Sequence, residues 1–360
     1  MAVSASPATR TFALFGAESG PAGLAGPVVA ALRARGFSAA ESASEAAIVL
    51  NVVDRDAPRP FRRKARGTFV AALWSLPEMP ADPLAATYPM LVRALANISL
   101  CHVPGHGVLF TTMERGNYLV PDGPELAEQV VERLEPLATS TLVIDNDFRT
   151  DLEPELWDGD VITREIADVG KRLDGLGLLP APFPVEDLVS ADDLRRIKRL
   201  YAIGGLSYGN LSQRKDADRF WMSASGVDKA NLREPARDIL LVSGYDATGG
   251  RIVLSVRPDL EPRRVSVDAI EHWMIYRENP QVGAILHVHA WVEGIEATEI
   301  NFPCGTEELA ASVAALVAAA PDPAHAIVGL RNHGITATGD SLTEILDRIE
   351  PTLLRQVPMS

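Results

Sequence analysis

Cysteine, net positive charge and long apolar runs are all scarce in this sequence. Only Cys101 and Cys304 are cysteines among 360 residues, which excludes a disulfide framework and favours a reducing compartment. Asp and Glu outnumber Lys and Arg by 48 to 34, and the net charge of −14 argues against nucleic-acid and membrane partners. The run AASVAALVAAA is too short to span a bilayer, and the N-terminus does not read as a signal peptide. We therefore expect a cytoplasmic protein that acts on a small molecule.

The first half of the chain alternates strand-like and helix-like segments. Apolar strand-like runs occupy residues 11–16, 46–53, 67–73, 98–103 and 140–147, and helix-like runs occupy residues 22–36, 83–97 and 124–138. Such alternation predicts a Rossmann-like α/β domain with a largely parallel sheet. The loop GAESGPAG after the first strand does not fit the G-x-G-x-x-G pattern of nucleotide-binding loops, so we interpret it as a turn.

A stretch rich in Gly and Pro, residues 172–188, separates two halves with different patterns, so we place the domain boundary near residues 175–190. We assign residues 1–180 to the α/β domain, whose role stays open, and residues 190–360 to a second domain. In the second domain the patterns predict helices over residues 190–205, 266–279 and 305–320, strands over 283–291 and 326–330, a turn over 331–339 and a last helix.

Histidines mark the strongest candidate site. His287 and His289 lie two residues apart in the strand-like run ILHVHAW, so they project to the same side of a sheet. His333 follows another short strand and precedes Gly334, which permits a sharp turn. A lone buried histidine usually belongs to the core, but three histidines make a divalent-metal site plausible, and imidazole suits zinc.

Carboxylates lie upstream of the histidine pair, in the predicted helix 266–279. Asp268 and His272 are four residues apart and share a helix face, and Glu271 lies near that face. A carboxylate beside a metal can serve as a general acid or base, or as a further ligand. The simpler interpretation of Asp268 is an acidic residue that favours the N-terminus of the helix.

Taken in order, five motifs in the second half resemble the class II aldolase/adducin family, which includes fuculose-phosphate aldolase and ribulose-5-phosphate 4-epimerase. The motifs are GNLS at 209–212, SASG at 223–226, SVDAIEHWMIYRENPQVGAILHVHA at 266–290, GTEELA at 305–310 and RNHG at 331–334. The resemblance covers roughly residues 190–355. It implies an α/β/α domain around a mostly antiparallel sheet, and it implies that family members assemble as homo-oligomers.

The resemblance also implies a metal site and a catalytic acid. The family's zinc ligands fall on His287, His289 and His333, with manganese, cobalt or iron as alternatives to zinc. The family's catalytic acid falls on Asp268, where the aldolases usually have Glu and the epimerase branch has Asp.

The family's phosphate pocket falls on Asn210, Ser225, Gly226 and Ser266. One phosphate donor of the family is replaced by Val267, so a carboxylate is an alternative to a phosphorylated substrate. The family's catalytic tyrosines have no counterpart, either in the short segment WVEGIEATEINFPC or after the last helix. Either the N-terminal domain supplies these proton donors, or the reaction does not need them.

These features predict a divalent-metal-dependent carbon–carbon lyase of the aldolase type. It would act on a small hydroxy or keto compound, such as a sugar phosphate, through a metal-stabilised enediolate, with Asp268 handling the proton. A decarboxylase or epimerase of a hydroxy or keto acid is the alternative among enzymes. A non-catalytic adducin-like scaffold is the alternative outside enzymes, but a scaffold has no need of the three histidines.

Overall fold

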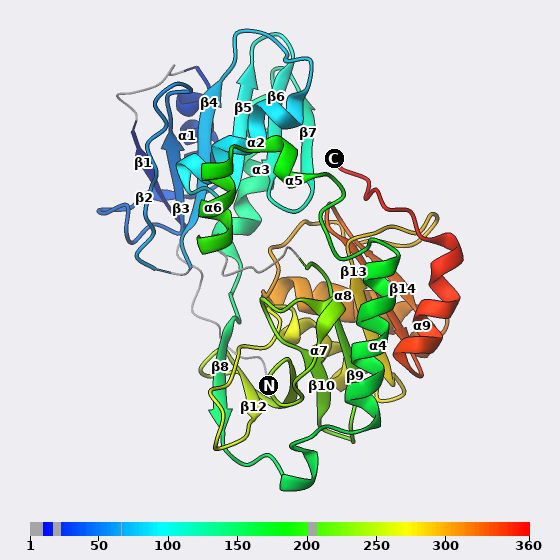
Figure 1. Ribbon diagram of the computed structural model, residues 1–360. Coiled ribbons are helices and arrows are strands. Elements are labelled where there is room, and N and C mark those ends of the chain that lie inside the picture. Colours follow the sequence, from blue (N-terminus) through cyan, green and yellow to red (C-terminus); the bar gives the residue numbers. More distant parts are fainter. Residues whose placement is uncertain (1–9, 17–22, 66, 201–206) are drawn as a thin grey trace. The chain divides into compact units, whose positions relative to one another are not determined.

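A computed structural model describes residues 10–16, 23–65, 67–200 and 207–360, and it confirms a mixed α/β protein. The chain divides into two compact units (Figure 1). Unit 1 is formed by Met1–Ser140 with Phe183–Arg199 and Met359–Ser360, and unit 2 by Thr141–Pro182 with Leu200–Pro358. None of the described helices is long and apolar enough to cross a membrane.

Unit 1 contains a seven-stranded sheet in the order β2-β1-β3-β4-β5-β6-β7. Its strands are β1 (Thr11–Phe15), β2 (Ser38–Ala39), β3 (Ile48–Val52), β4 (Phe69–Ser75), β5 (Ile98–Val103), β6 (Gly107–Thr112) and β7 (Gly116–Pro121). The pairings from β2 to β5 are parallel, whereas β6 and β7 add antiparallel hairpins that the sequence patterns did not predict. His106 lies in the exposed turn between β5 and β6. Residues 17–22 of the loop GAESGPAG lie outside the described residues.

Helices cover both faces of this sheet. They are α1 (Ala25–Ala34), α2 (Pro83–Ala94) and α3 (Leu126–Thr139). Leu32 of α1 and Val130 of α3 belong to one apolar cluster, whereas Met90 of α2 belongs to the cluster on the other face. The later helices α5 (Val185–Leu188) and α6 (Ala191–Leu200) belong to the same unit, where Arg93 of α2 pairs with Asp193 at 3.0 Å. Residues 201–205 of the predicted helix 190–205 lie outside the described residues.

Unit 2 contains an eight-stranded sheet in the order β14-β15-β13-β9-β10-β11-β12-β8. Its strands are β8 (Asp145–Arg149), β9 (Asn210–Arg214), β10 (Phe220–Ser223), β11 (Ile239–Asp246), β12 (Arg251–Ser255), β13 (Ala284–Val288), β14 (Ile327–Leu330) and β15 (Gly334–Gly339). All pairings are antiparallel except that of β12 with β8. The predicted turn over 331–339 is therefore wrong beyond His333, because Gly334–Gly339 forms the buried strand β15.

Four helices pack against this second sheet. They are α4 (Val161–Gly175), α7 (Ala269–Glu278), α8 (Glu307–Ala319) and α9 (Leu342–Ile349). Helix α4 packs with α9, and α7 packs with α8 behind the strands in the view of Figure 1. Between them lies a core that includes Trp221, Leu286 and Ile345, all fully buried. Unit 2 is thus a layered α/β body with the candidate site residues inside it.

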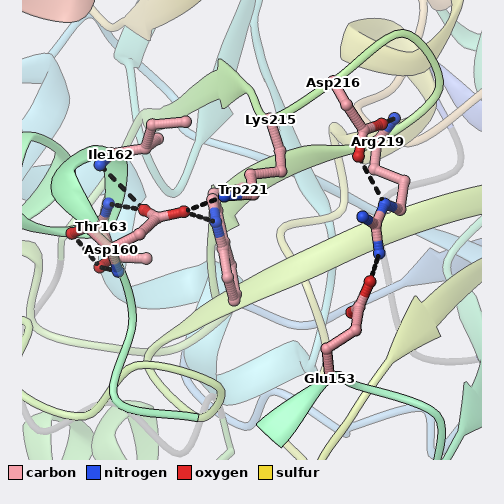
Figure 2. Close-up of polar contacts among 8 residues, drawn as sticks. All are labelled: Glu153, Asp160, Ile162, Thr163, Lys215, Asp216, Arg219 and Trp221. Carbon is pink, nitrogen blue, oxygen red and sulfur yellow. Dashed lines mark hydrogen bonds and ion pairs between the residues drawn. The ribbon is translucent and has the colours of Figure 1, made fainter. Parts of the chain in front are cut away.

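Residues 141–182 belong to unit 2, whereas we predicted the domain boundary near residues 175–190. Strand β8 pairs in parallel with β12, and Figure 2 shows how the start of α4 is fixed to the β9–β10 hairpin. Asp160 accepts hydrogen bonds from the backbone of Thr163 at 3.1 Å, from Lys215 at 2.8 Å and from Trp221 Nε1 at 3.1 Å. Lys215 and Trp221 are distant from Asp160 in sequence, so local Gly and Pro content does not reveal these contacts.

Candidate metal centre

The three predicted histidines come together in unit 2. His287 is the fourth residue of β13, His289 follows the end of that strand, and His333 is the last turn residue before β15. Antiparallel pairing of β13 with β15 brings the turn beside the strand end. The ring centroids lie 4.8–5.2 Å apart, and the candidate ligand atoms lie within 4.8 Å of one another.

Backbone geometry holds the turn close to the strand. Asn332 has a φ of +56°, a conformation that Asn tolerates better than most residues. A Cβ at Gly334 would lie 2.3 Å from the carbonyl oxygen of Val288, so only glycine allows this approach. The glycine that follows His333 therefore brings the third histidine against the other two.

Spacing of the ring nitrogens fits one shared ion. His289 Nε2 and His333 Nε2 lie 3.2 Å apart. Two nitrogens that each lie about 2.0–2.1 Å from a tetrahedral zinc ion are themselves about 3.3 Å apart. Three imidazoles are also the donor set of known catalytic zinc sites, which leave a position open for water or substrate. The residues present therefore fit a divalent cation.

Two neighbours of the histidines were not predicted as site residues. The Tyr208 ring stacks on His289 with centroids 5.2 Å apart and planes inclined by 20°. Cys304 Sγ lies 3.4 Å from His333 Nε2, and no disulfide joins Cys304 to Cys101. In the sequence, the only signal for Cys304 was its position directly before the GTEELA motif. The number of cysteines alone does not show that Cys304 lies near the histidines.

Asp268 lies at the start of α7 and is tied to the sheet that carries the histidines. Its carboxylate oxygen Oδ2 accepts a hydrogen bond of 2.8 Å from Asn210 Nδ2. Asn210 is directly opposite His287 in the pairing of β9 with β13. All three side chains are buried. The structure therefore brings together the predicted acid, one predicted pocket residue and one predicted ligand.

The other predicted pocket residues lie beside the segment that leads into α7. The backbone N–H of Ser225 donates to Arg264 O at 2.8 Å, and that of Ser266 donates to Ser223 O at 3.3 Å. Gly226 has a φ of +68° and open space where a Cβ would point. Residues 223–225 and 264–266 thus run antiparallel to each other, so Ser225 and Gly226 lie beside the segment that contains Ser266, two residues before Asp268.

Glu271 occupies a more buried position than the predicted helix face suggested. Its side chain is fully buried, and Thr336 Oγ1 of β15 donates to Oε1 at 2.6 Å. Burial, together with the negative charge of Asp268, raises the pKa of Glu271 to about 8. His272, by contrast, contacts Ser212 at 2.6 Å, and burial lowers its pKa well below the usual value. His272 is therefore a neutral core residue.

Lys229 is a buried cation that sequence reasoning missed. It is only 4 % exposed, and its Nζ donates to Ser207 O at 2.6 Å. Burial lowers its pKa to about 8, against an attraction to Asp268 that raises it. In the sequence its only signal was a position three residues after Gly226.

Part of the chain resembles known proteins in its sequence. Residues 195–292 match the family described as the class II aldolase and adducin N-terminal domain. A methylthioribulose-1-phosphate dehydratase of Leptospira biflexa is 31% identical over 126 residues, which are 34% of this chain and 54% of that protein. A protein of the same name from Sodalis glossinidius is 37% identical over 82 residues, 23% of this chain and 35% of that protein. The chain thus spans about half the length, or less, of these curated relatives.

Solved structures give more distant matches. An L-fuculose 1-phosphate aldolase is 20% identical with a TM-score of 0.36, covering 52% of this chain and 80% of that one. An L-fuculose-1-phosphate aldolase from Thermus thermophilus is 21% identical with a TM-score of 0.33, covering 53% of this chain and 90% of that one.

Proposed function

Because residues 195–292 carry a domain of the class II aldolase and adducin family, we propose that this protein is a divalent-metal-dependent lyase acting on a small hydroxy or keto compound. One observation carries the proposal. Three histidines whose ligand atoms lie within 4.8 Å of one another adjoin a buried carboxylate, Asp268, that is fixed by Asn210. An ion site next to a positioned acid or base is the arrangement that bond cleavage beside a carbonyl group requires.

His287, His289 and His333 would hold the cation, with zinc first and manganese, cobalt or iron as alternatives. Once bound, the cation would supply a Lewis acid that polarises a carbonyl oxygen of the substrate.

Asp268 would remove or return the proton of the reacting group. Its position at the first turn of α7 is fixed, because Asn210 donates to one carboxylate oxygen at 2.8 Å and the side chain is buried. The other oxygen, Oδ1, is the one we assign to the substrate proton. Asparagine at position 268 keeps the size of the side chain but cannot accept a proton, so Asp268→Asn should abolish turnover while metal content stays unchanged.

An anionic group of the substrate would bind at Ser225, Gly226 and Ser266. The backbone N–H groups of Ser225 and Ser266 already donate to backbone carbonyls, so the hydroxyls of these two serines would be the donors to phosphate or carboxylate. Buried Lys229, which is attracted to Asp268, adds one positive charge near this place. Its presence offsets the loss of the hydroxyl that Val267 replaces.

Two kinds of bond cleavage fit this site, and a different comparison supports each of them. Aldol-type carbon–carbon cleavage follows from the family. Loss of water beside a carbonyl follows from the curated relatives, which carry the name methylthioribulose-1-phosphate dehydratase. Both start from a proton transfer that Asp268 can perform, and both suit a ketose phosphate as substrate.

The experiment combines metal analysis with product analysis on the full-length protein. Metal content is measured for wild type, His287→Ala and His333→Ala, with His325→Ala as the control because His325 is a partly exposed residue paired with Asp322. We expect about one ion per chain in wild type and His325→Ala, and none in the other two variants. A wild type that takes up no divalent ion contradicts the lyase and favours the scaffold.

The metal-loaded protein is then incubated in deuterated water with a panel of ketose phosphates and hydroxy acids. Aldehyde plus ketone products indicate carbon–carbon cleavage, and a product lighter by one water indicates dehydration. Carbon dioxide or an inverted carbon centre indicates the decarboxylase or epimerase. Absence of deuterium incorporation and of every product, across the panel, contradicts catalysis at Asp268.

A further inference from the structure

A chain of three buried side chains leads from α7 to the candidate metal centre. Thr336 Oγ1 donates to Glu271 Oε1 at 2.6 Å, and the same Oγ1 lies 3.4 Å from His287 Nδ1. Thr336 and His287 are directly opposite in the pairing of β15 with β13, so the backbone fixes their spacing. Thr336 and His287 are fully buried, and Glu271 is 1 % exposed.

The direction of the hydrogen bonds follows from the number of protons. Threonine has one hydroxyl proton, and in this geometry that proton points to Glu271. The oxygen of Thr336 then faces His287 as an acceptor, which requires a proton on His287 Nδ1. A neutral imidazole with a proton on Nδ1 has its lone pair on Nε2. This direction holds when Glu271 is ionised, and also when its carboxyl group is neutral with the proton on Oε2, because Oε1 then still accepts from Thr336.

We propose that Glu271 and Thr336 are positioning residues that hold His287 as the Nδ1–H tautomer, so that its Nε2 is presented to a divalent cation. The inference rests on the metal site of the proposed function and deepens it. It assigns to Glu271 a role separate from that of Asp268: Asp268 acts on the substrate, and Glu271 acts on a ligand of the cation through Thr336.

The cost of the arrangement supports a role beyond packing. A carboxyl group that is removed from water needs hydrogen-bond partners, and Glu271 Oε2 has none among the described residues. An apolar residue would fill this part of the core at lower cost. Acceptors that orient metal-bound histidines are the known use of such groups, and their loss typically costs about 10–100-fold in metal affinity.

The first test is spectroscopic and needs no catalysis. The metal-free protein, labelled with ¹⁵N at its seven histidines, is examined by NMR for the protonated nitrogen of each ring. The His287 signals are assigned by their absence in His287→Gln. We expect a proton on Nδ1 and a bare Nε2 for His287. A proton on Nε2 would overturn the proposal.

The second test is metal affinity, with a matched pair of variants on one strand. Thr336→Val removes the relay, whereas Thr338→Val removes an equally buried hydroxyl on the same face of β15, which donates to Pro323 O at 2.8 Å. We expect zinc affinity to fall about 10–100-fold in Thr336→Val and to stay near wild type in Thr338→Val. Equal affinities in the two variants would overturn the relay.

Variants of the carboxyl group test the other end of the relay. Glu271→Gln keeps an acceptor oxygen and should retain wild-type zinc affinity and the Nδ1–H tautomer, whereas Glu271→Leu should lose affinity as Thr336→Val does. Loss of affinity in Glu271→Gln alone would contradict the acceptor role. If wild type binds no zinc, the proposed lyase fails, but the NMR result on the metal-free protein still decides whether the relay exists.

Discussion

The buried lysine gives the sharpest prediction on stability. Lys229 is 4 % exposed, and burial lowers its pKa from 10.5 to about 8. The folded protein therefore binds this proton less tightly than the unfolded chain does. Between about pH 8 and pH 10.5 the unfolded chain holds more protons, so folding becomes more favourable as the pH rises through this window.

The size of the effect follows from the shift. One pKa unit corresponds to about 1.4 kcal/mol, so the full contribution of Lys229 is about 3 kcal/mol. Lys229→Met removes the titrating group and keeps most of the volume. From about pH 7 to pH 10, the free energy of unfolding of wild type should therefore rise by about 2.5 kcal/mol relative to that of the variant.

Urea unfolding followed by tryptophan fluorescence, on metal-free protein at several pH values, measures this difference. Lys171→Met is the control, because Lys171 is an exposed residue of α4 that pairs with Asp168 at 3.0 Å. Its unfolding free energy should run parallel to that of wild type. A constant difference between wild type and Lys229→Met over the whole range would refute the argument that burial sets this pKa.

Four further variants test other parts of unit 2. Asp160→Ala removes the N-cap of α4 and a partner of Lys215, so urea unfolding should show a loss of about 2 kcal/mol or more. At Gly209, whose φ is +72°, an added Cβ would lie 2.5 Å from the carbonyl oxygen of His287, so Gly209→Ala should lower zinc affinity. At Gly226, whose φ is +68°, the space around an added Cβ is open, so Gly226→Ala should cost only about 1 kcal/mol of stability. Trp221→Ala empties a fully buried site and should cost about 3–5 kcal/mol in the same urea assay.

Local sequence patterns predicted most of the individual helices and strands, but they did not predict which of them belong to the same unit. The periodic helix 266–279 and the apolar run 283–291 appear as α7 and β13. Helix α4 went unpredicted although Ile166, Val169 and Leu173 form a buried stripe behind the N-cap Asp160. Membership of a sheet depends on partners far along the chain, and the pairing of β8 with β12 has no local signature.

The histidine site could be predicted because its residues recur at short, fixed spacings. His289 lies beyond the end of β13 rather than within it, yet the two-residue spacing still places its ring 5.2 Å from that of His287. Lys229 could not be predicted in the same way, because its burial follows from a hydrogen bond to the backbone at Ser207 and from the neighbourhood of Asp268. A charged residue in a short surface turn such as the 3-10 helix Lys229–Asn231 is normally exposed, and only the folded chain shows otherwise.

Charge balance explains why the buried groups of this site belong together. Because the pKa of Glu271 is raised to about 8, its carboxyl group is neutral at pH 7, and the negative charge of Asp268 is balanced by the positive charge of Lys229. The three histidines bind a cation only as neutral rings, so the protein alone carries a charge of about zero here. A divalent ion makes the site positive, and the site then attracts an anionic substrate. Metal and anion should therefore bind cooperatively, and phosphate that binds equally well with and without zinc would contradict this account.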